Sequence, residues 1–320
     1  MLESWDDFWT SFLQKKRLEQ YIESMNSVEV PDTVKNICYE IYSDYDSFCN
    51  DLDKIRINLI QDVEKLPGVH LITSRVKSIE SLLEKVIKKR YDGLFDKSNL
   101  YSRITGKDYK NVLTDLIGIR LILSYRGDWK TLHGAILEKF PLKNNNEYRE
   151  HFFIPHEENK IFIAEKPCAY YAYDDDLSIY EGEFINTKLK ESGYRSVHYI
   201  VSYHGVYVEL QARTIYDEAW SDCDHSYVYK QDSNPSYDAL HRLSKILCEY
   251  TNSSNDLGEL MRLIYKNYPI LDMEDGIHYK TQRKTIAKID HIIGRFKNTL
   301  DTFIDFRQNL CEEEEGEINE

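Results

Sequence analysis

The chain has 320 residues, of which 41 are basic and 55 are acidic, and its formal charge is −14. This excess of acid argues against a protein that coats nucleic acid in general, so any contact with a polyanion has to be local. An apolar fraction of 42% and an aromatic fraction of 13% suffice for a large core and exclude global disorder.

No apolar run reaches the roughly 18 residues that a membrane-spanning helix needs. The first seven residues, Met1-Leu-Glu-Ser-Trp-Asp-Asp, are acidic where a secretory leader would be basic. The six cysteines form no Cys-x-x-Cys pair, which argues against a zinc site and a disulfide framework. We therefore expect a soluble cytoplasmic protein with reduced thiols.

The first part of the chain has the periodicity of helices. Apolar side chains recur at helical spacing over residues 5–13 and 34–52. A turn signal at Pro67-Gly68 precedes a third apolar stripe over residues 76–87. The opposite side of this third predicted helix carries Arg75, Ser78, Lys85 and Lys89.

Between residues 115 and 213 the pattern changes to short β-rich runs, and helical periodicity returns beyond Ile215. The sequence therefore predicts an α+β fold, with a mixed β-sheet core and helical extensions at both ends. We place the N-terminal extension at 1–70, the core at 71–230 and the C-terminal extension, with its acidic tail, at 231–320. The predicted strands are Leu116–Leu123, Phe152–Pro155, Ile161–Ile163, Val197–Tyr203 and Val206–Ala212.

The most informative segment is a predicted hairpin over residues 192–214. A two-residue loop at His204-Gly205 pairs Ile200 with Glu209 and sets the register along both strands. Directly opposed residues share a face, so one face of the hairpin is apolar and the other polar. The polar face carries Ser196, His198, Glu209, Gln211 and Arg213.

A hairpin can be amphipathic merely because water wets one side, and this alternative stays open. Here, however, the polar face gathers side chains that can orient a polar ligand, bind a cation and accept a proton. A Mg²⁺ site needs a second carboxylate, for which Asp115, at the head of a predicted strand, is the candidate. The alternative is an Asp that satisfies local backbone amides, and the spacing does not separate the two.

The helix predicted from Arg75 offers a seat for polyphosphate. Arg75-Val-Lys-Ser78 stands at its expected start, where backbone amides and the macrodipole favour phosphate, and Lys85 lies two turns further on. A solvated basic surface is the alternative. A P-loop or Rossmann mode of nucleotide binding is excluded, because neither Gly-x-x-x-x-Gly-Lys nor Gly-x-Gly-x-x-Gly occurs.

Five short segments carry a common signature: Arg75–Ser81, Asp115–Arg120, Gly193–His198, Val208–Thr214 and Trp220–His225. In this order and context they resemble the synthetase domain of the RelA/SpoT family. The resemblance covers about residues 70 to 230 and is specific as a set. Ser192 replaces the Asn of the Asn-Gly-Tyr motif of ordinary short alarmone synthetases, and Asp224 replaces the Glu of their Trp-Ala-x-x-Glu-His motif. These departures resemble the toxic branch found in toxin–antitoxin and phage-defence pairs.

The resemblance implies a nucleotidyltransferase-like synthetase core and a pyrophosphokinase, which transfers the β,γ-pyrophosphate of ATP to a ribose 3′-hydroxyl with Mg²⁺ as cofactor. The acceptor it favours is the 3′-CCA adenosine of tRNA, whose modification inhibits translation. The alternatives are alarmone synthesis from GDP/GTP or adenine nucleotides in the stringent response, and a catalytically inactive nucleotide-sensing or partner-binding module. An antitoxin protein and self-association are further partners that it allows.

The resemblance also assigns roles to residues of this chain. Asp115 and Glu209 bind Mg²⁺, and Glu209 helps to deprotonate the acceptor hydroxyl. The residues expected to contact ATP are Arg75, Lys77, Ser78, Lys85 and Arg120. Tyr194 stacks on the acceptor base, and the other acceptor-side residues are His198, Gln211, Arg213 and His225.

Two basic clusters offer local contacts for tRNA, with solvated helix faces as the alternative. They are Lys88, Lys89 and Arg90, and Lys280, Arg283, Lys284 and Lys288. Hydrolysis of the product is not expected, because no His-Asp dipeptide of the family's hydrolase domain occurs.

Overall fold

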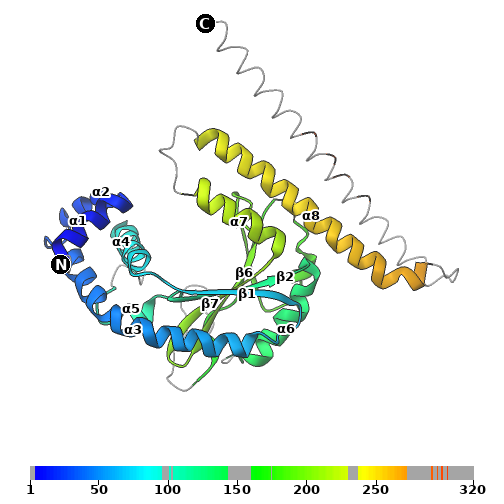
Figure 1. Cartoon of the computed structure of the whole chain (residues 1–320), viewed down its shortest axis with the longest axis horizontal. Coiled ribbons are helices and arrows are strands. Elements are labelled where there is room, and N and C mark those ends of the chain that lie inside the picture. The colour runs from blue at the N-terminus through cyan, green and yellow to red at the C-terminus, as the bar shows by residue number, and fades with distance from the viewer. Residues whose placement is uncertain are drawn as a thin grey trace, which may run out of the picture.

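The computed structural model shows a mixed β-sheet between two sets of helices, which confirms the predicted α+β class (Figure 1). None of the described helices is both long and apolar enough to cross a bilayer. The described residues are 4–95, 101, 104–142, 160–173, 175–229 and 237–271, with the single positions 290, 294, 297 and 301.

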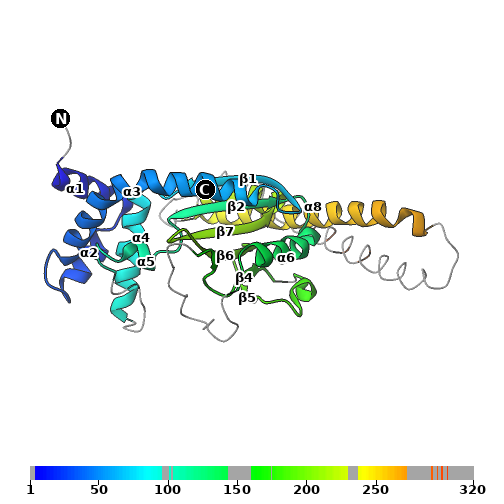
Figure 2. The same ribbon diagram turned by 90° about the horizontal axis from the view of Figure 1, so that it is seen from below.

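Helices form the N-terminal part of the chain, as the periodicity predicts. The first begins at Ser4, whose Oγ accepts a hydrogen bond from the amide of Asp7, and it ends at Arg17 in the left-handed conformation. Figure 2 shows most of these helices gathered at one end of the sheet, while the longest runs from there along the sheet. They are α1 (Trp5–Lys16), α2 (Glu19–Asn26), α3 (Thr33–Val63), α4 (Ile79–Phe95) and α5 (Tyr109–Val112).

The segment around Arg75 corrects the prediction of a helix that starts there. Residues Val69–Val76 form strand β1, and helix α4 begins only at Ile79. The strand is rich in β-branched side chains, which fit a pleated surface better than a helix. Ser78 precedes the helix, and its Oγ accepts a hydrogen bond from the amide of Ser81 at 3.3 Å. Arg75 therefore projects from a strand, and Ser78 caps the helix.

The sheet has seven strands in the order β1-β2-β7-β6-β4-β5, and β3 pairs with β6. The pairs β2–β7 and β4–β5 are parallel, and the remaining pairs are antiparallel. Three strands, β1, β4 and β5, were not among the predicted runs, and the predicted run Phe152–Pro155 lies outside the described residues. The remaining strands are β2 (Ile117–Leu123), β3 (Phe162–Ile163), β4 (Cys168–Tyr171), β5 (Asn186–Leu189), β6 (Ser196–Tyr203) and β7 (Val206–Thr214).

The predicted hairpin is confirmed in its register. Ile200 pairs with Glu209, and the loop consists of His204 and Gly205. Both loop residues have positive φ, 47° and 79°, as a type I′ turn requires. The right-handed twist of the two strands matches this turn, which holds the polar and apolar faces in place.

The apolar face of the hairpin belongs to the main core. Tyr199 is fully buried there and accepts a hydrogen bond from the indole of Trp129 at 3.0 Å. Helix α6 (Trp129–Lys139) and helix α3 lie on this side of the sheet, and α7 (Ile215–Tyr227) and α8 (Tyr237–Leu271) lie on the other (Figure 1). The short 3-10 helices are η2 (Arg126–Asp128) and η3 (Leu177–Tyr180). The polar face is therefore turned towards α7.

Candidate active site

Three neighbouring strands bring one row of residues together on the polar face. Arg75 of β1 pairs with Gly118 of β2, and Gly118 pairs with Glu209 of β7. Since Gly118 has no side chain, a cavity of about 220 Å³ remains between its neighbours. We name it the Gly118 cavity, and its lining is Thr73, Ser74, Arg75, Asp115, Gly118, Ile119, Arg120, Glu209 and Gln211.

Asp115 lies just before β2 and contacts two lysines. Its Oδ2 is 2.8 Å from the Nζ of Lys77 and 2.8 Å from the Nζ of Lys85, whereas its Oδ1 is buried without a hydrogen-bond partner. Burial raises the pKa of Asp115, but the charges of Lys85 and Lys77 outweigh this effect and lower the pKa below its usual value. Among the described residues, the hydrogen bonds of this carboxylate go to lysine side chains and not to backbone amides, which favours the binding role over the local one.

Glu209 is held by side chains of the same face. Its Oε1 lies 3.1 Å from Nδ1 of His198, and its Oε2 accepts a hydrogen bond from Nε2 of Gln211 at 2.6 Å. Burial raises the pKa of Glu209, but the hydrogen bond and charge of His198 more than offset this and the pKa is lowered. Glu209 is therefore an oriented carboxylate at neutral pH.

The two carboxylates fit a divalent cation that binds together with phosphate. Asp115 and Glu209 line the same cavity, and Oδ1 of Asp115 is a hard oxygen donor with no other partner. Mg²⁺ commonly takes one or two carboxylates from a protein and completes its octahedron with water and substrate phosphates. Among the described residues, no three His, Cys, Asp or Glu side chains form a site for a metal ion by themselves.

A second and larger cavity adjoins Glu209 on its other side. Its volume is about 760 Å³, and we name it the Glu165 cavity. His198 reaches it, and Nε2 of that ring lies 2.9 Å from the hydroxyl of Tyr194. The ring of Tyr170 meets His198 edge-on at 4.7 Å. Its lining is Thr114, Glu165, Lys166, Cys168, Tyr170, Ile185, Asn186, Thr187, Lys188, His198, Ile200 and Glu209.

Glu165 is the acidic residue of this site that sequence reasoning missed. Burial, together with the negative charge of Glu209, raises the pKa of Glu165 to about 7, although Lys85 acts in the opposite direction. In the sequence Glu165 only follows the short apolar run Phe162–Ile163. Nothing local indicates that the sheet places it beside Glu209.

Two of the expected ATP contacts are engaged elsewhere. Arg120 lines the Gly118 cavity, but its Nη1 lies 2.6 Å from Oε1 of Glu218 and 3.3 Å from Oδ1 of Asp222, both on α7. Ser78 lines neither cavity and bonds to Ser81. Arg75 lines the Gly118 cavity, and Lys77 and Lys85, which line neither cavity, pair with Asp115.

Three of the expected acceptor contacts, Tyr194, Arg213 and His225, line neither cavity. Arg213 is buried and bonds to Gln211, to Ser221 at 2.9 Å and to Glu218 at 3.3 Å. Its guanidinium also lies 5.4 Å from the ring centre of Tyr194. His225 is exposed in the last turn of α7. Arg213 therefore supports the site from behind, and His225 lies outside it.

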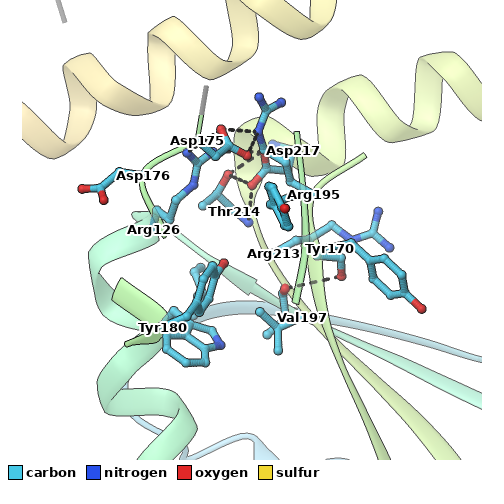
Figure 3. A pocket seen from close by; sticks show the side chains of 15 residues that line it. Arg126, Tyr170, Asp175, Asp176, Tyr180, Arg195, Val197, Arg213, Thr214 and Asp217 are labelled. Carbon is cyan, nitrogen blue, oxygen red and sulfur yellow. Dashed lines mark hydrogen bonds and ion pairs between the residues drawn. The ribbon is translucent and has the colours of Figure 1, made fainter. Parts of the chain in front are cut away.

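A buried ionic network surrounds Arg195, the residue that follows Tyr194 (Figure 3). Arg195 contacts Asp175 at 2.8 Å, and Arg126 reaches Asp217 at 3.5 Å and Asn252 of α8 at 3.0 Å. The space inside the network is about 30 Å³, which suits a water molecule and no substrate. The network joins α8 to the strands of the site.

Part of the expected RNA contact is also corrected. Arg90 is buried and donates hydrogen bonds to Glu29 at 2.9 Å and to the carbonyl of Ile104 at 2.8 Å. Lys88 pairs with Glu84 at 2.9 Å. Arg90 therefore holds α4 against its neighbours, whereas Lys88 pairs within α4 and Lys89 lies 5.2 Å from the ring centre of Tyr101. The second cluster, Lys280 to Lys288, lies outside the described residues.

Comparison with known proteins gives a family match and structural likenesses. No curated protein matches the chain. A GTP pyrophosphokinase family protein from Streptococcus pneumoniae is 21% identical, with 80% of this chain and 94% of that chain covered and a TM-score of 0.39. Small alarmone synthetase 2 from Bacillus subtilis is 21% identical, with 73% and 98% covered and a TM-score of 0.38. Small alarmone synthetase 1 from the same organism, bound to its product pppGpp, is 20% identical, with 74% and 98% covered and a TM-score of 0.38.

The family match covers half of the chain. The model described as the region found in RelA/SpoT proteins matches residues 74–234. This range contains Arg75, Asp115, Glu209 and the whole of α7. The chain therefore belongs to the RelA/SpoT family, whose synthetase region is of the pyrophosphokinase type.

Proposed function

We propose that the chain is an ATP-dependent pyrophosphokinase that acts on the 3′-terminal adenosine of tRNA. The observation that supports this most is the position of Glu209. Its carboxylate lines both the Gly118 cavity, which Arg75 and Arg120 also line, and the Glu165 cavity. The general base has to take a proton from the acceptor and also face the phosphates of the donor. It therefore has to lie between the two cavities, as Glu209 does. The proposed catalytic domain spans residues 71–230.

The Gly118 cavity would hold the triphosphate of ATP. Lys77 and Lys85 now neutralise Asp115, and on binding they would exchange its carboxylate for phosphate oxygens. Bound Mg²⁺, held by Asp115 and Glu209, would neutralise charge on the phosphates. Pyrophosphoryl transfer needs alignment and charge neutralisation more than a covalent nucleophile, and this residue set supplies both.

Glu209 would act as the general base. The 3′-oxygen of the acceptor forms a bond to the β-phosphorus, the bond from that phosphorus to the oxygen bridging to the α-phosphate breaks, and AMP leaves with the bridging oxygen. The hydroxyl proton passes to Glu209, which His198 and Gln211 keep ionised and oriented. A positioned base contributes about 10²–10⁴-fold to such a rate.

The Glu165 cavity would hold the acceptor nucleoside. Tyr170 lines this cavity beside His198, and Tyr194, which does not line it, bonds to His198. Its volume of about 760 Å³ lies in the upper part of the range of ligand pockets and leaves room beyond one base. Ser192 and Asp224, where ordinary short synthetases carry Asn and Glu, favour the toxic branch and therefore tRNA. Since an aromatic ring stacks on any purine, GDP and GTP are the second candidates.

The test is a panel of acceptors with ATP labelled in its γ-phosphate. We expect label on deacylated tRNA and release of AMP, and growth arrest when the protein is produced in cells. Label on GDP or GTP alone would select alarmone synthesis. Label on no acceptor, with ATP still bound, would select the silent nucleotide-sensing module. Relief of growth arrest by a co-produced neighbouring protein would identify an antitoxin.

A further inference from the structure

A third cavity lies where helix α7 ends and helix α8 begins. Its volume is about 330 Å³, and it has no lining residue in common with the two cavities that Glu209 lines. Four of its residues belong to α8, beyond the family region that ends at residue 234. We name it the α7–α8 cleft, and its lining is Ser192, Asp224, Val228, Tyr229, Tyr237, His241, Ser244 and Lys245.

One tight turn of the chain links a residue of the cleft to Tyr194, which bonds to His198 of the proposed acceptor site. Ser192 lines the cleft, and Tyr194, two residues further on, bonds to His198. Two residues span at most about 7 Å. Between them Gly193 has a φ of 89°, and a side chain there would collide with the thiol of Cys248 on α8. The close packing of Cys248 on this turn holds the cleft and Tyr194 in one rigid arrangement.

The lining of the cleft suits a nucleobase and its phosphate. Tyr237 and His241 stack at 5.7 Å with an angle of 21° between their rings. Tyr229, two residues beyond α7, also lines the cleft, where it stacks on His225 at 5.3 Å and keeps 52% of its surface exposed. Flat aromatic faces of this kind bind bases of any sequence by stacking. Lys245 adds an exposed ammonium group to the same cleft, in a chain whose formal charge is −14.

The cleft also has hydrogen-bonding groups in fixed positions. Ser244 donates a hydrogen bond to Oδ1 of Asp224 at 2.6 Å, and the indole of Trp220 donates to the Ser244 carbonyl at 3.0 Å. The Asp224 carboxylate therefore points in a fixed direction and can accept hydrogen bonds from the amino groups of a base. An aromatic wall, a fixed carboxylate and an ammonium group together match a nucleotide, and they do not match an apolar peptide or an acyl chain.

We infer that the α7–α8 cleft binds the nucleotide that precedes the acceptor nucleoside in a single-stranded RNA 3′ end. This inference rests on the proposed function, because it takes the acceptor to be the end of an RNA. The shared Ser192–Tyr194 turn places the two nucleoside sites next to each other, as adjacent nucleotides of one strand require. A mononucleotide acceptor would leave the cleft empty.

The first test is binding, measured in a Glu209→Gln background that prevents transfer. A fluorescent RNA that ends in CCA is titrated with this protein. The titration is repeated with two double variants, in which Tyr237→Ala or Tyr229→Ala is combined with Glu209→Gln. We expect each to weaken binding about 5- to 100-fold, which corresponds to the loss of one stacked base. Tyr237→Phe keeps the ring and should bind as the parent does. Tyr227→Ala is the matched control, because Tyr227 is 62% exposed near the end of α7 and does not line the cleft.

The second test is transfer, and it separates failure of the inference from failure of the proposed function. Single Tyr237→Ala and Tyr229→Ala variants should lose transfer to RNA and keep transfer to adenosine or GDP. RNA transfer at the parent rate with unchanged binding would overturn the inference and leave the function intact. Equal loss with mononucleotide acceptors would also overturn it, because the tyrosines would then only support Tyr194. RNA binding that depends on the cleft, in a protein that transfers to no RNA, would support the inference and contradict the function.

Discussion

Gly118 of β2 lies directly opposite Glu209 of β7 in the parallel register of the two strands. The residue with no side chain thus stands beside the carboxylate that lines both cavities of the site. A Cβ at Gly118 would meet only the aliphatic part of Arg75, at 4.0 Å, so the backbone itself tolerates a side chain. The fold therefore does not require a glycine at this position, and the effect of the glycine is to keep space for a ligand.

Filling this space should block ATP without unfolding the protein. We expect Gly118→Val to abolish measurable ATP binding, because the branched side chain occupies the cavity floor, and to leave Tm almost unchanged. Gly118→Ala should have a smaller effect, and isothermal titration with a non-hydrolysable ATP analogue measures both. Gly134→Ala on α6, where a Cβ meets nothing within 4 Å, is the control. Normal ATP affinity of Gly118→Val would place the triphosphate elsewhere.

Lys85 should contribute directly to the affinity for ATP. It pairs with Asp115 at 2.8 Å and would exchange this partner for phosphate. We expect Lys85→Ala to raise the KM for ATP about 10- to 100-fold, which is the loss of one charge-assisted hydrogen bond. Lys88→Ala, one turn further along α4 and paired with Glu84, is the matched control and should retain the parent KM. If both variants have the same KM, the phosphate role of Lys85 is wrong.

His198 should set the pH dependence of the reaction through Glu209. Its hydrogen bond and charge lower the pKa of that carboxyl against the upward effect of burial. Without His198 the pKa of Glu209 should rise. On acidification, the His198→Ala variant should therefore lose its activity at a higher pH than the parent does. The pH profile of kcat/KM measures this shift of the acid limb. A reduced rate with an unmoved acid limb would mean that His198 acts only on the acceptor.

Glu165 should make the fold less stable as the pH rises. Its pKa is raised from its unfolded value to about 7, so the folded protein binds the proton more tightly than the unfolded chain does. Stability therefore falls as the pH increases from about 4.5 to 7. Glu165→Gln, which is always neutral, should raise Tm at pH 8 by a few degrees and change it little at pH 5. An equal change of Tm at both pH values would show that the carboxyl is not titrating.

The polar face of the hairpin follows from the sequence because its register depends on local features. The His204-Gly205 turn and the alternation of polar and apolar side chains together place Glu209 beside His198 and Gln211. Asp115 needed the family signature, since its nearest partners, Lys77 and Lys85, come from segments more than 25 residues away in the sequence.

The remaining features depend on tertiary contacts that no local pattern reveals. The segment before Ile79 is strand β1 because β2 offers it a pairing edge, although the helical stripe of α4 overlaps its end. Strands β4 and β5 have only four residues each and pair with each other. Glu165 enters the site only because these short strands fold beside β6, which no periodicity indicates.

The central claim is that the Glu209 carboxylate performs the chemistry between the two cavities. The most direct measurement is the rate of AMP release from ATP in the presence of deacylated tRNA, compared between the parent and Glu209→Gln at equal and saturating ATP. The account predicts a fall of at least about a hundredfold with retained ATP binding and unchanged Tm. A Glu209→Gln variant that releases AMP at the parent rate would contradict it.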